Sequence, residues 1–193
     1  MYVIAAMIVG FVMVKTYQEK DRMRRYVIVL LALAMICIVS YSVNFMTDNY
    51  NVMSAATSIM MAAQDFLLVS LFIYTTEFAR ISNKVTKVMT IAAFVIAIID
   101  SVVFIANIFN EIAVKYSLVK CDGIYVLGYE GELWFGIHAV MSMIITACII
   151  AVLVIKCIHI PGAYWGRYIV MAAGLAIIIL ILSLIHISEP TRP

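Results

Sequence analysis

The chain contains a series of apolar runs that are long enough to cross a lipid bilayer, and these runs constrain its fold more than any other feature. A straight helix needs about 20 apolar residues to cross the hydrocarbon core. Runs of about this length or longer occupy residues 26–46, 52–76, 88–109 and 133–155, and another begins at Tyr168. The first run, residues 1–14, is shorter. Either the true start lies upstream, or this helix is thinned at its end and Lys15 reaches back to the interface.

Composition supports burial in lipid. Hydrophobic residues make up 66% of the chain and charged residues 12%, against about 45–50% and about 25% in soluble domains. A water-soluble core of this size cannot hold so much apolar surface, so most of it must face lipid. The net charge of +2 is too small to indicate nucleic acid as a partner. The four cysteines fit no metal motif and no disulfide framework, and we predict neither a metal nor a cofactor.

The connectors between the apolar runs fall into two groups by charge. Ten of the 13 Lys and Arg residues lie in the connectors 15–25, 77–87 and 156–167. The connectors 47–51 and 110–132 hold only two between them. Because short cytoplasmic loops are enriched in Lys and Arg, the first group is predicted to be cytoplasmic. The N-terminus and the connector 110–132 are then predicted to lie outside.

The connector 110–132 contains a predicted β-hairpin. Two β-prone runs, residues 116–121 and 124–129, are separated only by Asp122-Gly123, a pair typical of a two-residue type I′ turn. The predicted fold class is therefore an all-α membrane protein, a bundle of six transmembrane helices with one extracytoplasmic β-hairpin between the fourth and fifth. The hairpin is interpreted either as a cap that senses a ligand or as a connector.

Two carboxylates within the predicted spans are candidate sensing residues. Asp65 falls near the midplane of the third span, and Asp100 falls toward the outer side of the fourth. A charged carboxylate at this depth costs about 2.5–3.5 kcal/mol on insertion scales, so it needs a partner or a water-filled pocket. Either the pair lines a ligand- or proton-sensitive cavity, or it is protonated or hydrogen-bonded to groups such as Ser40, Tyr41 and Asn44 and only fixes helix packing.

Two residues at the start of the fifth predicted span are further candidates. His138 lies about 7–8 Å below the outer mouth, at a rise of about 1.5 Å per residue, and approaches Asp100 if the fourth and fifth spans pack together. It is either a pH- or ligand-responsive group or an interfacial histidine satisfied by backbone or water. Trp134 is either part of the sensing site or a membrane-interface anchor. The sequence contains no catalytic motif that we recognise, so the residues present are predicted not to form an enzyme.

The C-terminal residues 182–193, LSLIHISEPTRP, differ from the rest of the chain. They hold two of the three prolines within the last four residues, and the string resembles translated sequencing-adapter sequence. We expect this tail to be artefactual and the native sequence to end near Ile181, within the sixth span. The domain is then predicted to cover residues 1–181.

Three stretches carry a resemblance to a known family. They are FLLVSLFIYTTEFAR at 66–80, GYEGELWFGIHAVMSMI at 128–144 and YWGRY at 164–168. In their order and spacing they resemble the N-terminal seven-transmembrane region of bacterial histidine kinases and related signalling proteins. The resemblance implies a seventh span and a cytoplasmic output domain, a histidine kinase or a diguanylate cyclase, in a homodimer in the bacterial plasma membrane. It also implies that the hairpin is a lid over the fourth and fifth spans.

The favoured function is a membrane-embedded sensory input domain that relays an extracytoplasmic or intramembrane stimulus to a cytoplasmic output. Its expected partners are the lipid bilayer and a small ligand or a proton. A small multi-pass transporter or channel subunit is the alternative, and it predicts inverted repeats and broken helices near the midplane. An intramembrane enzyme would need a converging catalytic set that we cannot assemble from the sequence.

Overall fold

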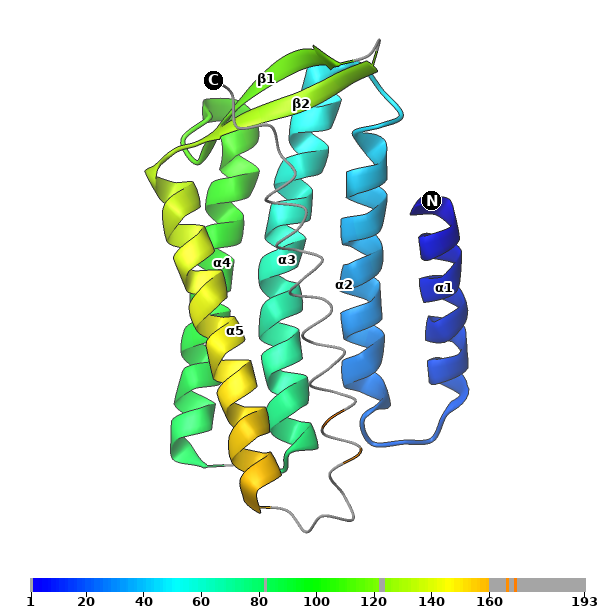
Figure 1. The fold of residues 1–193 in the computed structure, drawn as a ribbon, viewed down its shortest axis with the longest axis vertical. Coiled ribbons are helices and arrows are strands. Elements are labelled where there is room, and N and C mark those ends of the chain that lie inside the picture. The colour runs from blue at the N-terminus through cyan, green and yellow to red at the C-terminus, as the bar shows by residue number, and fades with distance from the viewer. Residues whose placement is uncertain (1, 82, 122–123, 160–165, 167–168, 170–193) are drawn as a thin grey trace.

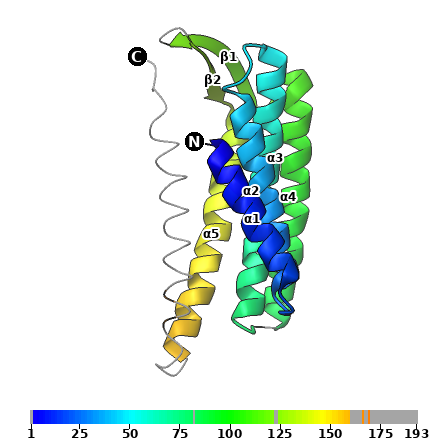
Figure 2. The ribbon, with the colours of Figure 1, turned by 90° about the vertical axis from the view of Figure 1, so that its right-hand side faces the viewer.

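The computed structural model describes residues 2–81, 83–121, 124–159, 166 and 169. The elements in these residues are, in chain order, α1 (Tyr2–Gln18), α2 (Arg24–Val43), α3 (Tyr50–Phe78), α4 (Lys84–Asn110), β1 (Val114–Cys121), β2 (Ile124–Gly131) and α5 (Leu133–His159). The helices stand side by side, and the two strands lie across one end of the bundle (Figure 1). Figure 2 shows α1 on the outer side of α2, at the edge of the bundle.

Four of these helices, α2 to α5, are long and apolar enough to cross a membrane. The predicted first span is the shorter helix α1, whose 17 residues extend over about 26 Å, less than a hydrocarbon core of about 30 Å. The predicted sixth span and the tail at 182–193 lie outside the described residues, apart from Ile169. The prediction of a mostly helical membrane bundle is confirmed, whereas six crossings stay a prediction.

The helix ends differ from the predicted ends where polar residues extend a helix. α4 begins at Lys84 rather than at Val88, because Asn83 and Thr86 form a capping box. The Asn83 side chain accepts a hydrogen bond from the Thr86 backbone N–H at 2.8 Å, and the Thr86 hydroxyl accepts one from the Asn83 N–H at 3.2 Å. These bonds satisfy N–H groups that the first turn of a helix leaves without partners. Part of the predicted basic connector is therefore helical.

The helix α3 is the centre of the bundle. It packs against α2, α4 and α5, and it contributes most of the buried residues of the described helices. One core cluster, near the hairpin, joins Met61 of α3 and Phe104 of α4 to Tyr116 of β1. A second cluster, Phe72 with Ile149 and Leu153, joins α3 to α5. Many large apolar side chains on the outer faces of the helices remain exposed, as expected of surfaces that face lipid.

The structure contains the predicted β-hairpin between α4 and α5. The strands pair antiparallel from Val114 opposite Gly131 to Cys121 opposite Ile124. This register leaves two residues for the connection, as the Asp-Gly pair predicts. Residues 122 and 123 lie outside the described part of the chain, so the type I′ turn stays a prediction, as does the side of the membrane on which the hairpin lies.

The hairpin is attached to the bundle through Asn107, near the end of α4. The Asn107 side-chain oxygen accepts hydrogen bonds from the backbone N–H groups of Ala113 at 2.7 Å and Val114 at 3.0 Å, and its amide group donates to the Val114 carbonyl at 3.0 Å. A second attachment joins the hydroxyls of Tyr116 and Ser58 at 3.2 Å. The expected lid over the fourth and fifth spans is thus also fastened to α3, because Tyr116 points toward that helix.

The two groups of connectors lie at opposite ends of the bundle. The α1–α2 and α3–α4 connectors and the C-terminal end of α5 lie at one end, and the α2–α3 connector and the hairpin lie at the other (Figure 1). At the first end, Arg22 and Glu77 form an exposed ion pair at 3.3 Å. The first two basic connectors and the basic last turn of α5 therefore lie at the same end, as the charge pattern requires, while the membrane face that they occupy stays a prediction.

Asn107→Ala is expected to loosen the hairpin. The substitution leaves the buried N–H groups of Ala113 and Val114 without their acceptor, at about 1–3 kcal/mol for each unsatisfied group. We expect a lower unfolding temperature in detergent and faster amide hydrogen exchange at these two residues. Asn110→Ala is the matched control, because the exposed Asn110 makes only a 3.4 Å contact with the Ile112 N–H. Equal exchange in both variants would contradict the anchoring role.

Candidate functional site

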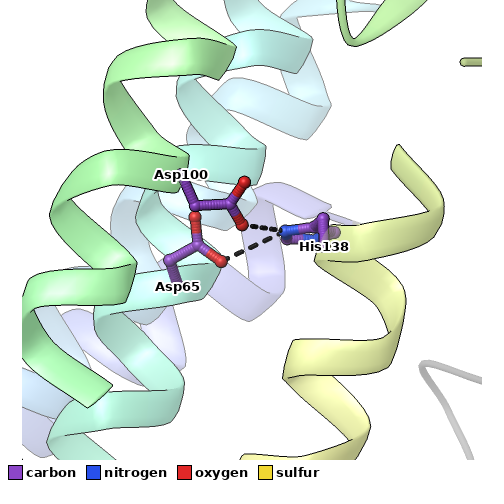
Figure 3. A group of neighbouring side chains, drawn as sticks. All are labelled: Asp65, Asp100 and His138. Carbon is purple, nitrogen blue, oxygen red and sulfur yellow. Dashed lines mark hydrogen bonds and ion pairs between the residues drawn. The ribbon is translucent and has the colours of Figure 1, made fainter. Parts of the chain in front are cut away.

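The structure brings all four predicted site residues together from three helices. Asp65 comes from α3, Asp100 from α4, and Trp134 and His138 from α5. Figure 3 shows the carboxylates of Asp65 and Asp100 directed at the imidazole of His138. We call Asp65, Asp100 and His138 the polar cluster. The sequence offered Asp65 and Asp100 as a pair lining one cavity and His138 as a possible neighbour of Asp100, but it predicted no contact between Asp65 and His138.

One imidazole nitrogen contacts both carboxylates of the polar cluster. The His138 Nδ1 atom lies 2.6 Å from Asp100 Oδ2 and 3.2 Å from Asp65 Oδ1. The three residues are buried, with exposed fractions of 6% for each aspartate and 8% for the histidine. A proton on Nδ1 is therefore donated mainly to Asp100 and is shared more weakly with Asp65.

Each aspartate also has a neutral donor near its second oxygen, although the single hydroxyl proton of Ser101 is shared between Asp65 and a backbone carbonyl. The Trp134 indole N–H donates to Asp100 Oδ1 at 2.7 Å, and the Ser101 hydroxyl lies 3.5 Å from Asp65 Oδ2 and 3.3 Å from the Ala62 carbonyl. Trp134 precedes His138 by one helical turn, so both side chains leave the same face of α5. Each carboxylate thus turns one oxygen toward His138 and the other toward a hydroxyl or an indole N–H.

Aromatic rings enclose the imidazole. The ring of Phe104, which is fully buried, meets that of His138 edge to face at 4.9 Å between centroids. The ring of Phe135 stacks on it at 6.2 Å. These rings place apolar surface beside the imidazole, which strengthens its electrostatic interactions with the carboxylates.

The depth of the polar cluster depends on where α5 begins. Asp65 lies about 22 Å from the start of α3, whereas His138 lies only about 7–8 Å from the start of α5, at a rise of about 1.5 Å per residue. The two can meet because α5 starts well below the level at which α3 begins beneath the hairpin (Figure 1). His138 is therefore deeper in the bundle than its place in the sequence implies.

The partners predicted on the second span are not the ones that the structure gives to the aspartates. Asn44 donates instead to the Thr57 hydroxyl, at 3.0 Å. The carboxylates bind groups of α4 and α5, because these helices pack against the polar face of α3. Sequence reasoning missed Ser101 and Phe104. Phe104 follows Asp100 by four residues, a helical spacing that could have identified it.

The polar cluster contains more acidic groups than basic groups. Two carboxylates face one imidazole, which can hold no more than a single positive charge. If both carboxylates are ionised the set is net negative, and net charge is costly at this depth. The arrangement is therefore suited to holding protons or a cation between three helices. The hydroxyl of Ser101 lies against Asp65 rather than against the imidazole of His138, so these residues are not arranged as a Ser-His-Asp triad.

A double-mutant cycle on Asp100→Ala and His138→Ala tests the contact between them. Hydrogen bonds that involve a charged group contribute about 1.5–3 kcal/mol, so we expect a coupling energy of this size in unfolding experiments in detergent. Asp48→Ala and His159→Ala form the control cycle, because these two residues lie at opposite ends of the bundle. Additivity within about 0.5 kcal/mol for the Asp100–His138 pair would show that the two do not interact.

Comparison with known proteins places the chain in a family. No curated protein matches the chain. A family model described as the N-terminal 7TM region of histidine kinase matches residues 1–192. This match confirms the predicted resemblance. Regions of this family are non-catalytic sensory domains in the membrane. Because the match covers almost the whole chain, the protein belongs to the family of N-terminal 7TM regions of histidine kinases.

Proposed function

We propose that this domain receives a stimulus, a small ligand or a proton, in the half of the bundle beneath the hairpin and relays it to a cytoplasmic output domain. The output is a histidine kinase or a diguanylate cyclase. The observation that carries the proposal is the polar cluster, in which buried groups of α3, α4 and α5 depend on one another's charge. A change in that charge alters a contact that joins three helices.

The helix α5 is the element suited to move. Its buried residues are His138, Ile149 and Leu153. The first belongs to the polar cluster, and the other two pack against Phe72 of α3, farther along the helix. Weakening the first contact while the second persists lets α5 pivot relative to α3. The stimulus acts by favouring one of two arrangements, so it must bind them with different affinities.

The proposed orientation follows from charge. The connectors 15–25 and 77–87 and the last turn of α5 carry basic residues, and they lie at the same end of the bundle (Figure 1). The positive-inside rule makes this end cytoplasmic and the hairpin extracytoplasmic. In this orientation α5 runs from the sensing end toward the cytoplasm. The intact protein works as a homodimer in the bacterial plasma membrane, in contact with lipid on the outer faces of its helices.

The transporter alternative finds less support. Transporter binding sites are commonly built from helices that are interrupted near the midplane. Each of α2, α3, α4 and α5 is a continuous helix over its described length. The polar groups meet through side chains, without unwound backbone in those helices.

Cysteine labelling tests the orientation. In a background without the native cysteines, Asp48→Cys in the α2–α3 connector should react with a membrane-impermeant maleimide in whole cells. Lys20→Cys in the α1–α2 connector should react only after the cells are opened. The reverse pattern would place the hairpin in the cytoplasm and would exclude an extracytoplasmic sensing end.

Asp100→Asn and His138→Gln in the full-length protein test the relay. We expect each to change the ratio of output activity between the stimulated and unstimulated states by about fivefold or more, since allosteric coupling energies are typically about 1–3 kcal/mol. Output is measured as autophosphorylation or as cyclic dinucleotide synthesis. The matched controls are Asp48→Asn and His159→Gln. If the cluster variants and the controls are alike in basal output, response and expression, the cluster has no part in signalling.

A further inference from the structure

We propose that Asp65, Asp100 and His138 bind one divalent transition-metal ion of the Zn²⁺ or Mn²⁺ type. The inference goes beyond the proposed function, because metal binding does not require that the domain signals. The sequence predicted no metal site, since the three ligands come from three helices and form no short motif. In the structure the three side chains come together, and one ligand atom from each of the three buried residues lies within 4.8 Å of the others.

The ligand atoms are close to the spacing that a metal ion needs. Around a tetrahedral ion with bonds of about 2.0–2.1 Å, neighbouring ligand atoms lie about 3.3–3.4 Å apart. The Nδ1–Oδ1 distance from His138 to Asp65 is already 3.2 Å. The Nδ1–Oδ2 distance to Asp100 is 2.6 Å, so it must lengthen by less than about 1 Å. A change of this size is within the range of a small side-chain rotation of Asp100 or His138.

The groups around the cluster orient one oxygen of each carboxylate for binding. The Trp134 indole holds Asp100 Oδ1, which leaves Oδ2 facing the histidine. Ser101 lies beside Asp65 Oδ2, which leaves Oδ1 facing the same nitrogen. Donors of this kind behind the ligands fix their orientation in metal sites, and their loss commonly weakens metal affinity about 10–100-fold.

Charge balance favours a divalent ion. Two ionised carboxylates and a neutral imidazole carry a charge of −2, which a divalent cation cancels. A neutral set is the form that a buried position within a membrane accepts most readily. Without the ion, the same site must take up protons to approach neutrality.

The ligand types select the class of metal. Imidazole nitrogen suits zinc and other transition metals, whereas calcium and magnesium prefer sites made of oxygen alone. No thiolate belongs to the cluster, so a soft ion such as Cu⁺ is not favoured. One nitrogen with two carboxylate oxygens is a mixed set for a borderline divalent ion, and Mg²⁺ should compete poorly.

Co²⁺ provides a direct test, because it quenches tryptophan fluorescence at short range. The chain has two tryptophans, so Trp165→Phe in the full-length protein leaves Trp134, which binds Asp100, as the only reporter in this chain's residues. Any tryptophans in other parts of the full-length protein are replaced as well. Chelator-treated protein in detergent is titrated with Co²⁺. We expect saturable quenching at one ion per chain, displacement by Zn²⁺, and no displacement by the same concentration of Mg²⁺.

Variants in the same background locate the site. His138→Gln and Asp100→Asn should weaken Co²⁺ affinity at least tenfold, and His159→Gln and Asp48→Asn should bind like the parent. Ser101→Ala keeps all three ligands and should weaken binding about tenfold, so it serves if the ligand variants do not fold. The proposal is overturned if the parent shows no saturable quenching, if Mg²⁺ displaces Co²⁺ as well as Zn²⁺ does, or if folded cluster variants bind like the controls. Output activity is not read here, so failure of metal binding is distinct from failure of the relay.

Discussion

The contact of one histidine nitrogen with two carboxylates is the interaction on which the half of this bundle beneath the hairpin depends. His138 Nδ1 is within 3.2 Å of an oxygen of both Asp65 and Asp100, and through these three side chains α5 is joined to α3 and α4. Separately, each group would be a costly polar residue at membrane depth. Together they satisfy one another, and the position of α5 becomes linked to whatever proton or ion the set holds.

This dependence follows from the physics of helices in lipid. Lipid tails are as apolar as the helix surfaces, so the hydrophobic effect gives little preference for one helix arrangement over another. Polar contacts then supply much of the specificity. Asn107 fastens the hairpin to α4, Tyr116 joins it to Ser58 of α3, and the polar cluster joins three helices below it. The apolar cluster of Phe72, Ile149 and Leu153 adds close packing near the other end.

The sequence predicts much of the fold, because the length of an apolar run and an Asp-Gly pair are local signals. The limits of α4 were less predictable, since the capping box of Asn83 and Thr86 starts the helix among charged residues. Asp65, Asp100 and His138 could each be recognised from their depth. The sequence left open whether they meet, because the contact of both carboxylates with one nitrogen depends on how far each helix is rotated and on how low the hairpin places the start of α5. For the same reason the sequence could not decide between partners on α2 and the partners on α4 and α5 that the structure gives to the aspartates.

The central claim is that the polar cluster sets the position of α5 relative to α4. Spin labels at Val85 and Ile158 report it, since both side chains are exposed near the end of the bundle opposite the hairpin. The distance between them is measured by pulsed electron resonance in the full-length protein without native cysteines, with and without Asp100→Asn. The account predicts that this substitution broadens or shifts the distance distribution by several ångströms, whereas Asp48→Asn does not. Identical distributions in both variants and the parent would contradict it.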